Sequence, residues 1–299
     1  MTAVLQILLV ALAAPLLPGV INRTKAKIAG RTGAPLLQGY YDLAKLLRKE
    51  MVLSSTTTWV FLLGPATAVV APLLASLFMP LIGAEAPLSF TGDFILFVYL
   101  FALARFCTTA AALDTGSAFE GMGSARELTF SALAEPALLF GLLALTRLSD
   151  RMTLSSLLGV SAADWRTASA ALVLVVASWF IVMLAENSRV PFDDPNTHLE
   201  LTMIHEVMVL DHSGPALGLI FYGAALKLFV FSALVADVML PRTGNALYDA
   251  GATIGAVFLI SVAIGLVESA MARLRLVRIP QLLIAASLVA GFAVVLVLR

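Results

Sequence analysis

The segment AENSRVPFDDPNTHLEL, residues 185–201, concentrates side chains that could do chemistry at the edge of a membrane. Glu186, Arg189 and Asp193 follow directly after the apolar run ALVLVVASWFIVML. Carboxylates and a guanidinium in such a place form ion pairs, shift each other's proton affinity, or bind a charged partner surface. The spacing therefore predicts a docking and coupling surface here, not a solvent loop.

Further ionisable residues extend a candidate proton path on both sides of this segment. Glu127 and Glu135 are eight residues apart, so on a helix they lie close to one face. Glu200 and Glu206 follow the motif, and Lys227 falls near the middle of an apolar run. An ionisable group at membrane depth costs at least ~2.5 kcal/mol, so each needs a partner or a function. Lys227 is either a structural ion-pair partner of Glu135 or a neighbour, or a member of the path; for carboxylates near span ends, interfacial solvation is the alternative.

The three histidines lie seven residues apart, at His198, His205 and His212. On a continuous helix they would share one stripe, whereas a metal pair needs a spacing of three or four residues. Contact with a partner protein, or titration beside the neighbouring glutamates, fits the spacing better, and no metal site is predicted. The single cysteine, Cys107, excludes an internal disulfide and a cysteine-ligated iron–sulfur cluster built by this chain alone.

The composition shows which elements must position these residues. Of 299 residues, 60% are hydrophobic and 13% charged, and the mean hydropathy is +0.97. Inside lipid every backbone polar group must be paired within its segment, so long apolar runs predict helices. We expect an all-α integral membrane protein forming one transmembrane helical domain, 1–299, with about eight spans and no catalytic residue of its own. The predicted spans are 3–22, 58–83, 92–113, 128–146, 167–187, 214–240, 250–268 and 281–298.

Charge and flanking sequence define the environment of this domain. The net charge is zero and no basic patch with interleaved aromatics occurs, so no nucleic-acid partner is expected. The first apolar run lacks a basic region before it, which indicates a first span and not a cleaved signal. Lysine and arginine number 13 on the side of the first loop and 5 on the other. This bias predicts a cytoplasmic-membrane protein with both termini outside.

The first loop contains a helix of mixed polarity. Within residues 36–50, leucines, tyrosines and an alanine occupy one helical face, and Lys45, Arg48 and Lys49 occupy the other. Such a pattern is typical of an amphipathic helix lying in the membrane interface, on the cytoplasmic side. A helix packed on a partner subunit is the alternative interpretation.

Four motifs together resemble one family, that of respiratory complex I subunit 1. GRTGAPLLQGYYDLAKLLRKE resembles the family's first-loop signature, and AENSRVPFDDPNTHLEL resembles its motif between spans five and six. SAFEGMGSARE and VESAMARLRLVRIPQLL resemble its charged stretches before the fourth and the last span. The continuation DDPNTHLELTMIHEVMVLDHSGP is similar to the branch found in membrane-bound [NiFe] hydrogenases of the formate hydrogenlyase and hydrogenase-4 type.

The resemblance implies a non-catalytic membrane subunit that couples redox chemistry to ion movement. Its expected partners are hydrogenase large and small subunits, antiporter-like membrane subunits and membrane lipid. The [NiFe] centre and iron–sulfur clusters are expected in those partners, with no cofactor bound by this chain. Departure from the quinone-reducing pattern in residues 193–215 argues against a quinone site.

Site residues fall into two predicted groups. The coupling or proton-path group is Glu127, Glu135, Glu186, Asp193, Glu200, Glu206 and Lys227. The docking and structural-charge group is Glu120, Arg126, Arg189, Asp194, His198, His205, Asp211, His212, Arg273 and Arg275.

Two other functions stay open at this stage. A quinone-binding subunit 1 of an NADH-quinone oxidoreductase would need a tunnel that opens near residues 36–50. A self-sufficient secondary transporter would show paired interrupted spans in two related halves, and the 185–212 pattern has no second copy.

Overall fold

The computed structural model describes residues 2–83, 85–193 and 203–298, and within these ranges the regular secondary structure is helical. Seven helical segments are long and apolar enough to cross a membrane. They are α1 with α2 (Thr2–Ala13 and Leu16–Ile28), α5 (Asp93–Asp114), α6 (Ala118–Ser149), α9 (Ser169–Glu186), α10 (Gly214–Met239), α11 (Ala246–Ala270) and α12 (Arg278–Val297). The prediction of an all-α integral membrane protein is thereby confirmed.

The remaining elements are shorter. The apolar helix α4, Val60–Ser76, falls within the predicted span 58–83. The helix α3, Gln38–Leu47, falls within the predicted amphipathic segment. Two short helices, α7 (Leu154–Leu157) and α8 (Ala162–Thr167), and the 3-10 helix η1 (Glu206–Val209) complete the order of elements.

Proline divides the first span into α1 and α2, and two tyrosines compensate for the break. Pro15 has no N–H, so the carbonyl of Ala11 loses its partner four residues on. The hydroxyl of Tyr222 on α10 donates to that carbonyl at 3.1 Å, and the hydroxyl of Tyr40 on α3 donates to the next one, of Leu12. The broken helix is therefore tied to both α3 and α10, as backbone groups in lipid require.

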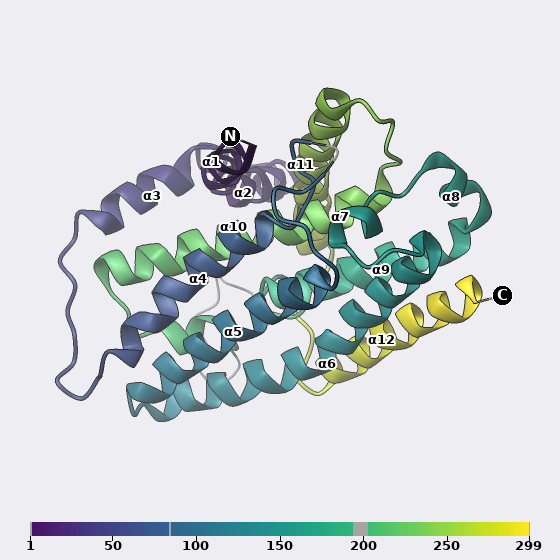
Figure 1. Cartoon of the computed structure of the whole chain (residues 1–299). Coiled ribbons are helices and arrows are strands. Elements are labelled where there is room, and N and C mark those ends of the chain that lie inside the picture. Colours follow the sequence, from purple (N-terminus) through teal and green to yellow (C-terminus); the bar gives the residue numbers. More distant parts are fainter. Residues whose placement is uncertain (1, 84, 194–202, 299) are drawn as a thin grey trace.

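Helix α10 lies at the centre of the bundle. It packs against α4, α9, α11 and α3, and most of its residues are buried. Around it, α4 packs on α5, and α12 packs on α6 and α9. Figure 1 shows α4, α5, α6 and α12 running alongside one another, while α11 rises across their direction to meet α2.

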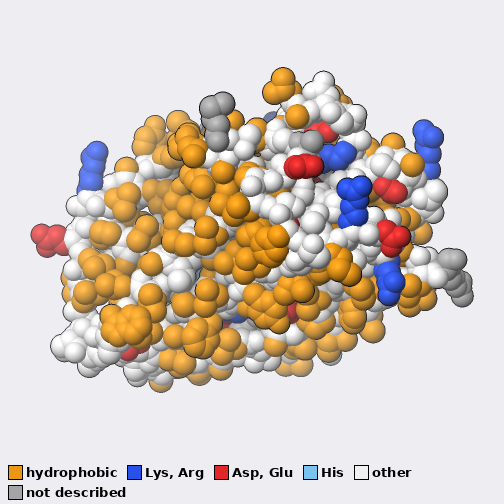
Figure 2. All heavy atoms as spheres, in the orientation of Figure 1, with side chains coloured by type: hydrophobic (Ala, Val, Ile, Leu, Met, Phe, Trp, Pro, Cys, Tyr) orange, Lys and Arg blue, Asp and Glu red, His pale blue; other side chains and the backbone are white. Residues whose placement is uncertain are grey.

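The outer surface is largely apolar. In Figure 2 hydrophobic side chains cover much of the visible face, and Lys, Arg, Asp and Glu lie mostly toward its two ends. Exposed leucines and phenylalanines occur on helices throughout the chain. A soluble protein does not expose continuous apolar area of this extent, whereas a protein surrounded by lipid does.

The region before the fourth predicted span differs from the sequence prediction. Glu120, Arg126 and Glu127 were expected in a loop, but α6 begins at Ala118 and carries all three. The loop from α5 is reduced to residues 115–117. Charges in the first turns of a helix lower the hydropathy of a 20-residue window, so the apolar part alone was recognised as helix.

Close packing of α6 on α9 gives a test of the fold. A Cβ added to Gly141 would overlap Nε1 of the buried Trp179, so Gly141→Ala must displace the Trp179 ring or separate the two helices. We expect a loss of about 1–3 kcal/mol of unfolding free energy, the usual cost of overpacking. Thermal unfolding of the purified protein in detergent, followed by far-UV circular dichroism, measures it. The matched control is Gly251→Ala on α11, where the new methyl meets nothing within 4 Å; equal midpoints for both variants would contradict the packing.

Candidate functional site

Three charged residues from three helices meet inside the bundle. Glu186 is the last residue of α9. Its Oε1 accepts a hydrogen bond from Nη2 of Arg105, on α5, at 2.6 Å. Its Oε2 lies 2.8 Å from Nζ of Lys227, on α10. We call Arg105, Glu186 and Lys227 the buried triad.

Burial makes the buried triad interdependent. The Glu186 side chain is 6% exposed, that of Arg105 12% and that of Lys227 21%. Lys227 also lies over the ring of Phe231, 5.9 Å from its centroid. Charges in a low-dielectric interior persist when each has a partner within hydrogen-bond distance. Of the two interpretations of Lys227, the structural ion pair is therefore present, with Glu186 as its partner and not Glu135.

Three cavities meet at Glu186. The first, of about 80 Å³, is lined by Arg105, Glu127, Glu186 and Lys227, together with His205 and apolar residues. The second, of about 20 Å³, is lined by Glu127, Glu186 and Asp193. The third, of about 10 Å³, is lined by Arg105, Glu186 and Glu135. One water molecule needs roughly 10–15 Å³, so water can occupy the spaces between these carboxylates.

Asp193 links the two described parts of the connection between α9 and α10, and it also contacts the connection between α11 and α12. Its Oδ1 lies 2.9 Å from Nη2 of Arg273, in the connection between α11 and α12. Its Oδ2 accepts hydrogen bonds from the backbone N–H of Ile204 and His205, at 3.0 and 3.1 Å. Arg126 supports the same stretch by donating to the carbonyl of Met203 at 2.9 Å. We call residues 187–193 and 203–213, the described parts of the connection between α9 and α10, the polar segment; Asp193, Arg126 and Arg273 hold it against the bundle.

A second group of charges lies where α11 meets α2. Glu268 is paired with Lys25 at 2.8 Å and with Arg189 at 3.6 Å, and its side chain is fully buried. Arg189 was predicted to be a docking charge, and it joins the polar segment to α11. A second contact lies close by: the backbone N–H of Leu274 donates to the carbonyl of Pro191 at 2.9 Å. Together with the pair of Arg189 and Glu268, it fixes the position of residues 189–191.

Two members of the predicted docking and structural-charge group, Glu120 and His212, lie inside the molecule. Glu120 is fully buried, and its Oε1 accepts the N–H of Asp211 at 3.1 Å. His212 is 5% exposed and stacks on Phe61 with ring centroids 3.9 Å apart. Both residues fasten η1 and the start of α10 onto the neighbouring helices, which is the structural role within that predicted group.

The expected stripe of histidines is also not formed in the described part of the segment. Residues 203–213 contain only the 3-10 helix η1, not a continuous helix. His205 lines the first cavity, whereas His212 packs on Phe61. His198, Asp194 and Glu200 lie outside the described residues. Glu206 begins η1 and is half-buried, and Asp211 and Arg275 are exposed.

Sequence reasoning missed Arg105 and Glu268 as site residues. Arg105 lies inside the predicted span 92–113, so the criterion that singled out Lys227, an ionisable group at membrane depth, applied to it equally. Glu268 ends the predicted span 250–268, and its sequence position gives no sign of its partners. Among the described residues, no group of three or more His, Cys, Asp or Glu is arranged to hold a metal ion.

The fold and the buried triad define a class: a multi-pass helical membrane protein with a charge cluster enclosed near one end of its bundle. The sequence model of the NADH dehydrogenase family matches residues 1–299. The chain belongs to this family.

Individual relatives place the chain within it. Formate hydrogenlyase subunit 4 of Escherichia coli (strain K12) is 31% identical over 285 residues, covering 93% of this chain and 92% of that protein. Hydrogenase-4 component C of the same organism is 30% identical, over 80% of this chain and 75% of that protein. A subunit of the NADH-quinone oxidoreductase of Geobacter metallireducens is 27% identical, over 69% of this chain and 64% of that protein.

A solved structure shares the fold. A chain of the membrane-bound sulfane sulfur reductase, an archaeal respiratory membrane complex, superposes with a TM-score of 0.81. The match covers 99% of this chain and 100% of that one at 20% sequence identity. The helices of this chain are therefore arranged as in that chain.

We expect substitutions of Glu186 and Lys227 in the buried triad to destabilise the protein by unequal amounts. Glu186→Gln leaves two buried cations without an anion, which costs about 3–5 kcal/mol when a buried pair is broken. Lys227→Met keeps the pair of Arg105 with Glu186 and replaces the ammonium by an apolar group of similar length. We expect Glu186→Gln to lower the thermal midpoint more than Lys227→Met, measured by tryptophan fluorescence in detergent. The reverse order would show that Lys227, not Glu186, is the group that the cluster needs.

Because His212 is buried, we expect the stability of the residues that precede α10 to depend on pH. Burial lowers the pKa of His212, so the folded protein keeps the ring neutral where the unfolded chain, with a pKa near 6.5, takes up a proton. Stability at this site is therefore complete above about pH 6.5 and decreases as the pH falls below it. The protection factors for hydrogen exchange of the backbone amides of residues 206–213, which correct for the intrinsic pH dependence of exchange, should fall on acidification in the wild type. His212→Phe keeps the stacking on Phe61 and should remove this fall; an equal fall in the variant would refute the assignment.

Proposed function

We propose that this chain is the membrane-anchor and coupling subunit of a respiratory-type [NiFe] hydrogenase complex. In this function it docks a cytoplasmic redox module and links it to proton or ion translocation by antiporter-like subunits. The observation that carries the proposal is the buried triad at the meeting point of three cavities. The relation to formate hydrogenlyase subunit 4 along nearly the whole of both chains supports the kind of complex.

The coupling role follows from how the charges are connected. Glu127 lines the first and second cavities, Glu135 the third, and Glu186 all three. A change in charge or water content in one cavity therefore acts on Glu186, whose two cationic partners belong to different helices, α5 and α10. In a medium of low dielectric such a change is felt strongly over these distances.

The docking role rests on the polar segment between α9 and α10. Asp193 lines the second cavity and is paired with Arg273, and Arg126 bonds the carbonyl of Met203 in the polar segment. A partner that presses on this segment would act on Asp193 and, through the second cavity, on Glu127 and Glu186. We propose that the partner is the redox module, with the segment on the cytoplasmic side of the inner membrane and both termini outside. The [NiFe] centre and the iron–sulfur clusters belong, in this proposal, to partner subunits.

A quinone-binding function is the second candidate, because an NADH-quinone oxidoreductase subunit is also a relative. The first cavity has a volume of about 80 Å³, whereas pockets that bind ligands of the size of a drug molecule have roughly 300–1,000 Å³. At the expected tunnel mouth, Tyr40 and Tyr222 bond α3 and α10 to α1. Both observations favour the coupling function without quinone. Binding of a radiolabelled short-chain quinone to the purified complex, competed by unlabelled quinone, would favour the second candidate instead.

Substitution of Glu186 tests coupling in the whole complex. We expect Glu186→Gln to reduce hydrogen-linked turnover with the physiological donor by about tenfold or more, equivalent to about 1.4 kcal/mol. Hydrogenase activity with an artificial acceptor should stay near the wild-type value, because the redox centres are in other chains. Both activities are measured on membranes, with co-purification of the subunits as the check on assembly.

The matched control is Glu85→Gln, an exposed glutamate outside the buried triad. It should leave both activities unchanged. Physiological turnover of an assembled Glu186→Gln complex at the wild-type rate would refute the coupling role of the buried triad.

A further inference from the structure

The end of α10 remote from Lys227 carries a second ionisable group, Asp237. The two residues are ten positions apart on one helix, which corresponds to about 15 Å along its axis. Glu186 ends α9 and α10 begins at Gly214, so Lys227 lies toward the face that carries the polar segment. Asp237 lies toward the opposite face, where residues 240–245 connect α10 to α11. We call this opposite face the far face.

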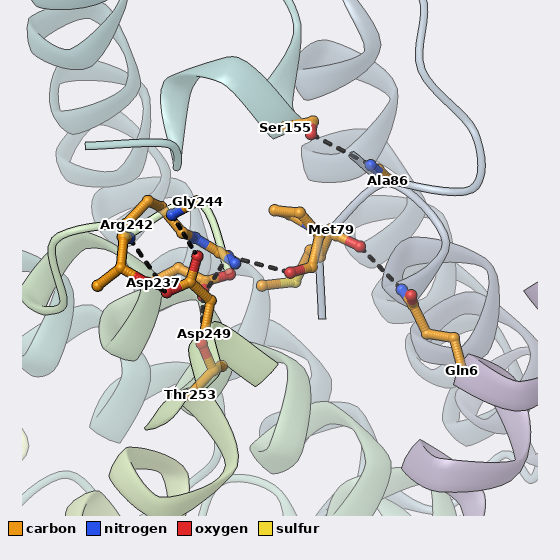
Figure 3. A network of polar contacts seen from close by, with 11 residues as sticks. Gln6, Met79, Ala86, Ser155, Asp237, Arg242, Gly244, Asp249 and Thr253 are labelled. Carbon is orange, nitrogen blue, oxygen red and sulfur yellow. Dashed lines mark hydrogen bonds and ion pairs between the residues drawn. The ribbon is translucent and has the colours of Figure 1, made fainter. Parts of the chain in front are cut away.

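Only one oxygen of Asp237 is used. Its Oδ1 accepts hydrogen bonds from Nη2 of Arg242 at 2.8 Å and from the hydroxyl of Thr253 at 2.9 Å, and these two residues converge on it in Figure 3. Its Oδ2 is buried without a partner among the described residues. The whole residue is 0% exposed. An ionised carboxylate accepts on both oxygens, and a buried oxygen left unpaired is costly, whereas a protonated one is neutral.

Asp249, which belongs to the same network in Figure 3, is satisfied on both oxygens. Its Oδ1 accepts from the N–H and the hydroxyl of Thr243, at 3.1 and 2.7 Å, and its Oδ2 accepts from the N–H of Gly244 at 3.2 Å. This aspartate is built to stay ionised and to hold the turn before α11. Of the two aspartates, Asp237 is therefore the one with an oxygen, Oδ2, that is free to take a proton.

The charges around Asp237 act in opposite directions. Arg242, which follows α10 and forms an ion pair with Asp237 at 2.8 Å, favours the ionised carboxylate, whereas Asp249, on α11, favours the protonated form. The other polar groups at this end are the hydroxyl of Thr253 and the carbonyl of Pro80, which accepts from Arg242 at 3.0 Å. With both aspartates ionised, the three side chains carry one net negative charge. A single proton neutralises the group.

A cavity connects this group with the far face. It has a volume of about 130 Å³ and is lined by Arg242, Thr243, Tyr248, Asp249 and Thr253 together with apolar residues. This volume holds several water molecules, at roughly 10–15 Å³ each. Both hydrogen-bond partners of Asp237 line the cavity, and two other lining residues, Thr243 in the turn and Tyr248 on α11, are exposed. The Thr253 hydroxyl can accept a proton from water on one side and give one to Asp237 on the other.

The opposite direction is closed. Between Lys227 and Asp237, residues 228–236 of α10 are all buried, and the polar one among them, Ser232, donates to Sδ of Met183 at 3.6 Å. None of the first three cavities is lined by Asp237, Arg242 or Thr253. The polar contacts of Asp237 therefore lead toward the far face and not along α10 to the buried triad.

We propose that Asp237 is a proton-exchange group, reached from the far face through the cavity at Arg242 and Thr253 and insulated from the buried triad. The site takes a proton on Oδ2 and returns it to the same side. The proposal does not require the hydrogenase function, because it concerns the ionisation of one side chain in the membrane-embedded protein.

Infrared difference spectroscopy of the full complex in oriented membrane vesicles tests this proposal. Acidification on the far face should produce the carbonyl-stretch band of a protonated carboxylic acid, and aspartate labelled with carbon-13 should shift that band. Asp237→Asn should abolish it, while Asp249→Asn should retain it. The Glu186→Gln variant should retain it too, which separates this outcome from the proposed coupling function.

Two results would overturn the proposal. One is a wild-type spectrum without a pH-dependent aspartic acid band between about pH 4 and about pH 9, a range that brackets ordinary and strongly raised carboxyl pKa values. The other is a band that responds only to the pH on the face of the polar segment. The isotope measurement needs only the wild-type protein, so a variant that fails to assemble does not prevent a decision.

Discussion

A carboxylate held between two cations inside a membrane protein constrains everything around it. Glu186 must keep Arg105 and Lys227 within hydrogen-bond distance, because any of the three alone in lipid would be expensive. The requirement fixes the relative depth of α5, α9 and α10, the three helices that carry them. It also explains why cavities collect here, since polar atoms attract water into gaps that apolar packing would otherwise close.

The same requirement, that polar groups inside the membrane have hydrogen-bond partners, explains the contacts at the break between α1 and α2. Pro15 frees the carbonyl of Ala11, and a tyrosine from α10 replaces the missing donor. A tyrosine from α3 bonds the neighbouring carbonyl, which holds the amphipathic helix against the bundle. The central helix thus carries one member of the buried triad and also secures the periphery, so displacement of α10 would disturb both.

Much of the fold was predictable, because lipid forces long apolar runs to be helices; the site was predictable only in part. Lys227 stood out by its charge at membrane depth and Glu186 by its place in the motif of residues 185–201, but their pairing depends on helix rotation, which one sequence does not reveal. Glu120 was placed in the docking and structural-charge group by the resemblance of the stretch SAFEGMGSARE, and His212 by the spacing of the histidines. In the structure, stacking on Phe61 and the N–H of Asp211 satisfy them inside. Long-range partners of this kind leave no local pattern.

The two ends of α10 allow an argument about how they can communicate. Protons cannot pass between Lys227 and Asp237 along this helix, since the side chains between them are buried and, except for Ser232, apolar. Packing remains as the link: α10 is close-packed on α4 and α11, and Gly223 lies so near the carbonyl of Ala68 that an added Cβ would be 2.5 Å from it. A helix held this tightly moves as a unit. If the buried triad shifts α10, the geometry of Asp237 with Arg242 and Thr253 changes with it. The helix can therefore pass a movement from one end to the other, although it does not conduct protons between them.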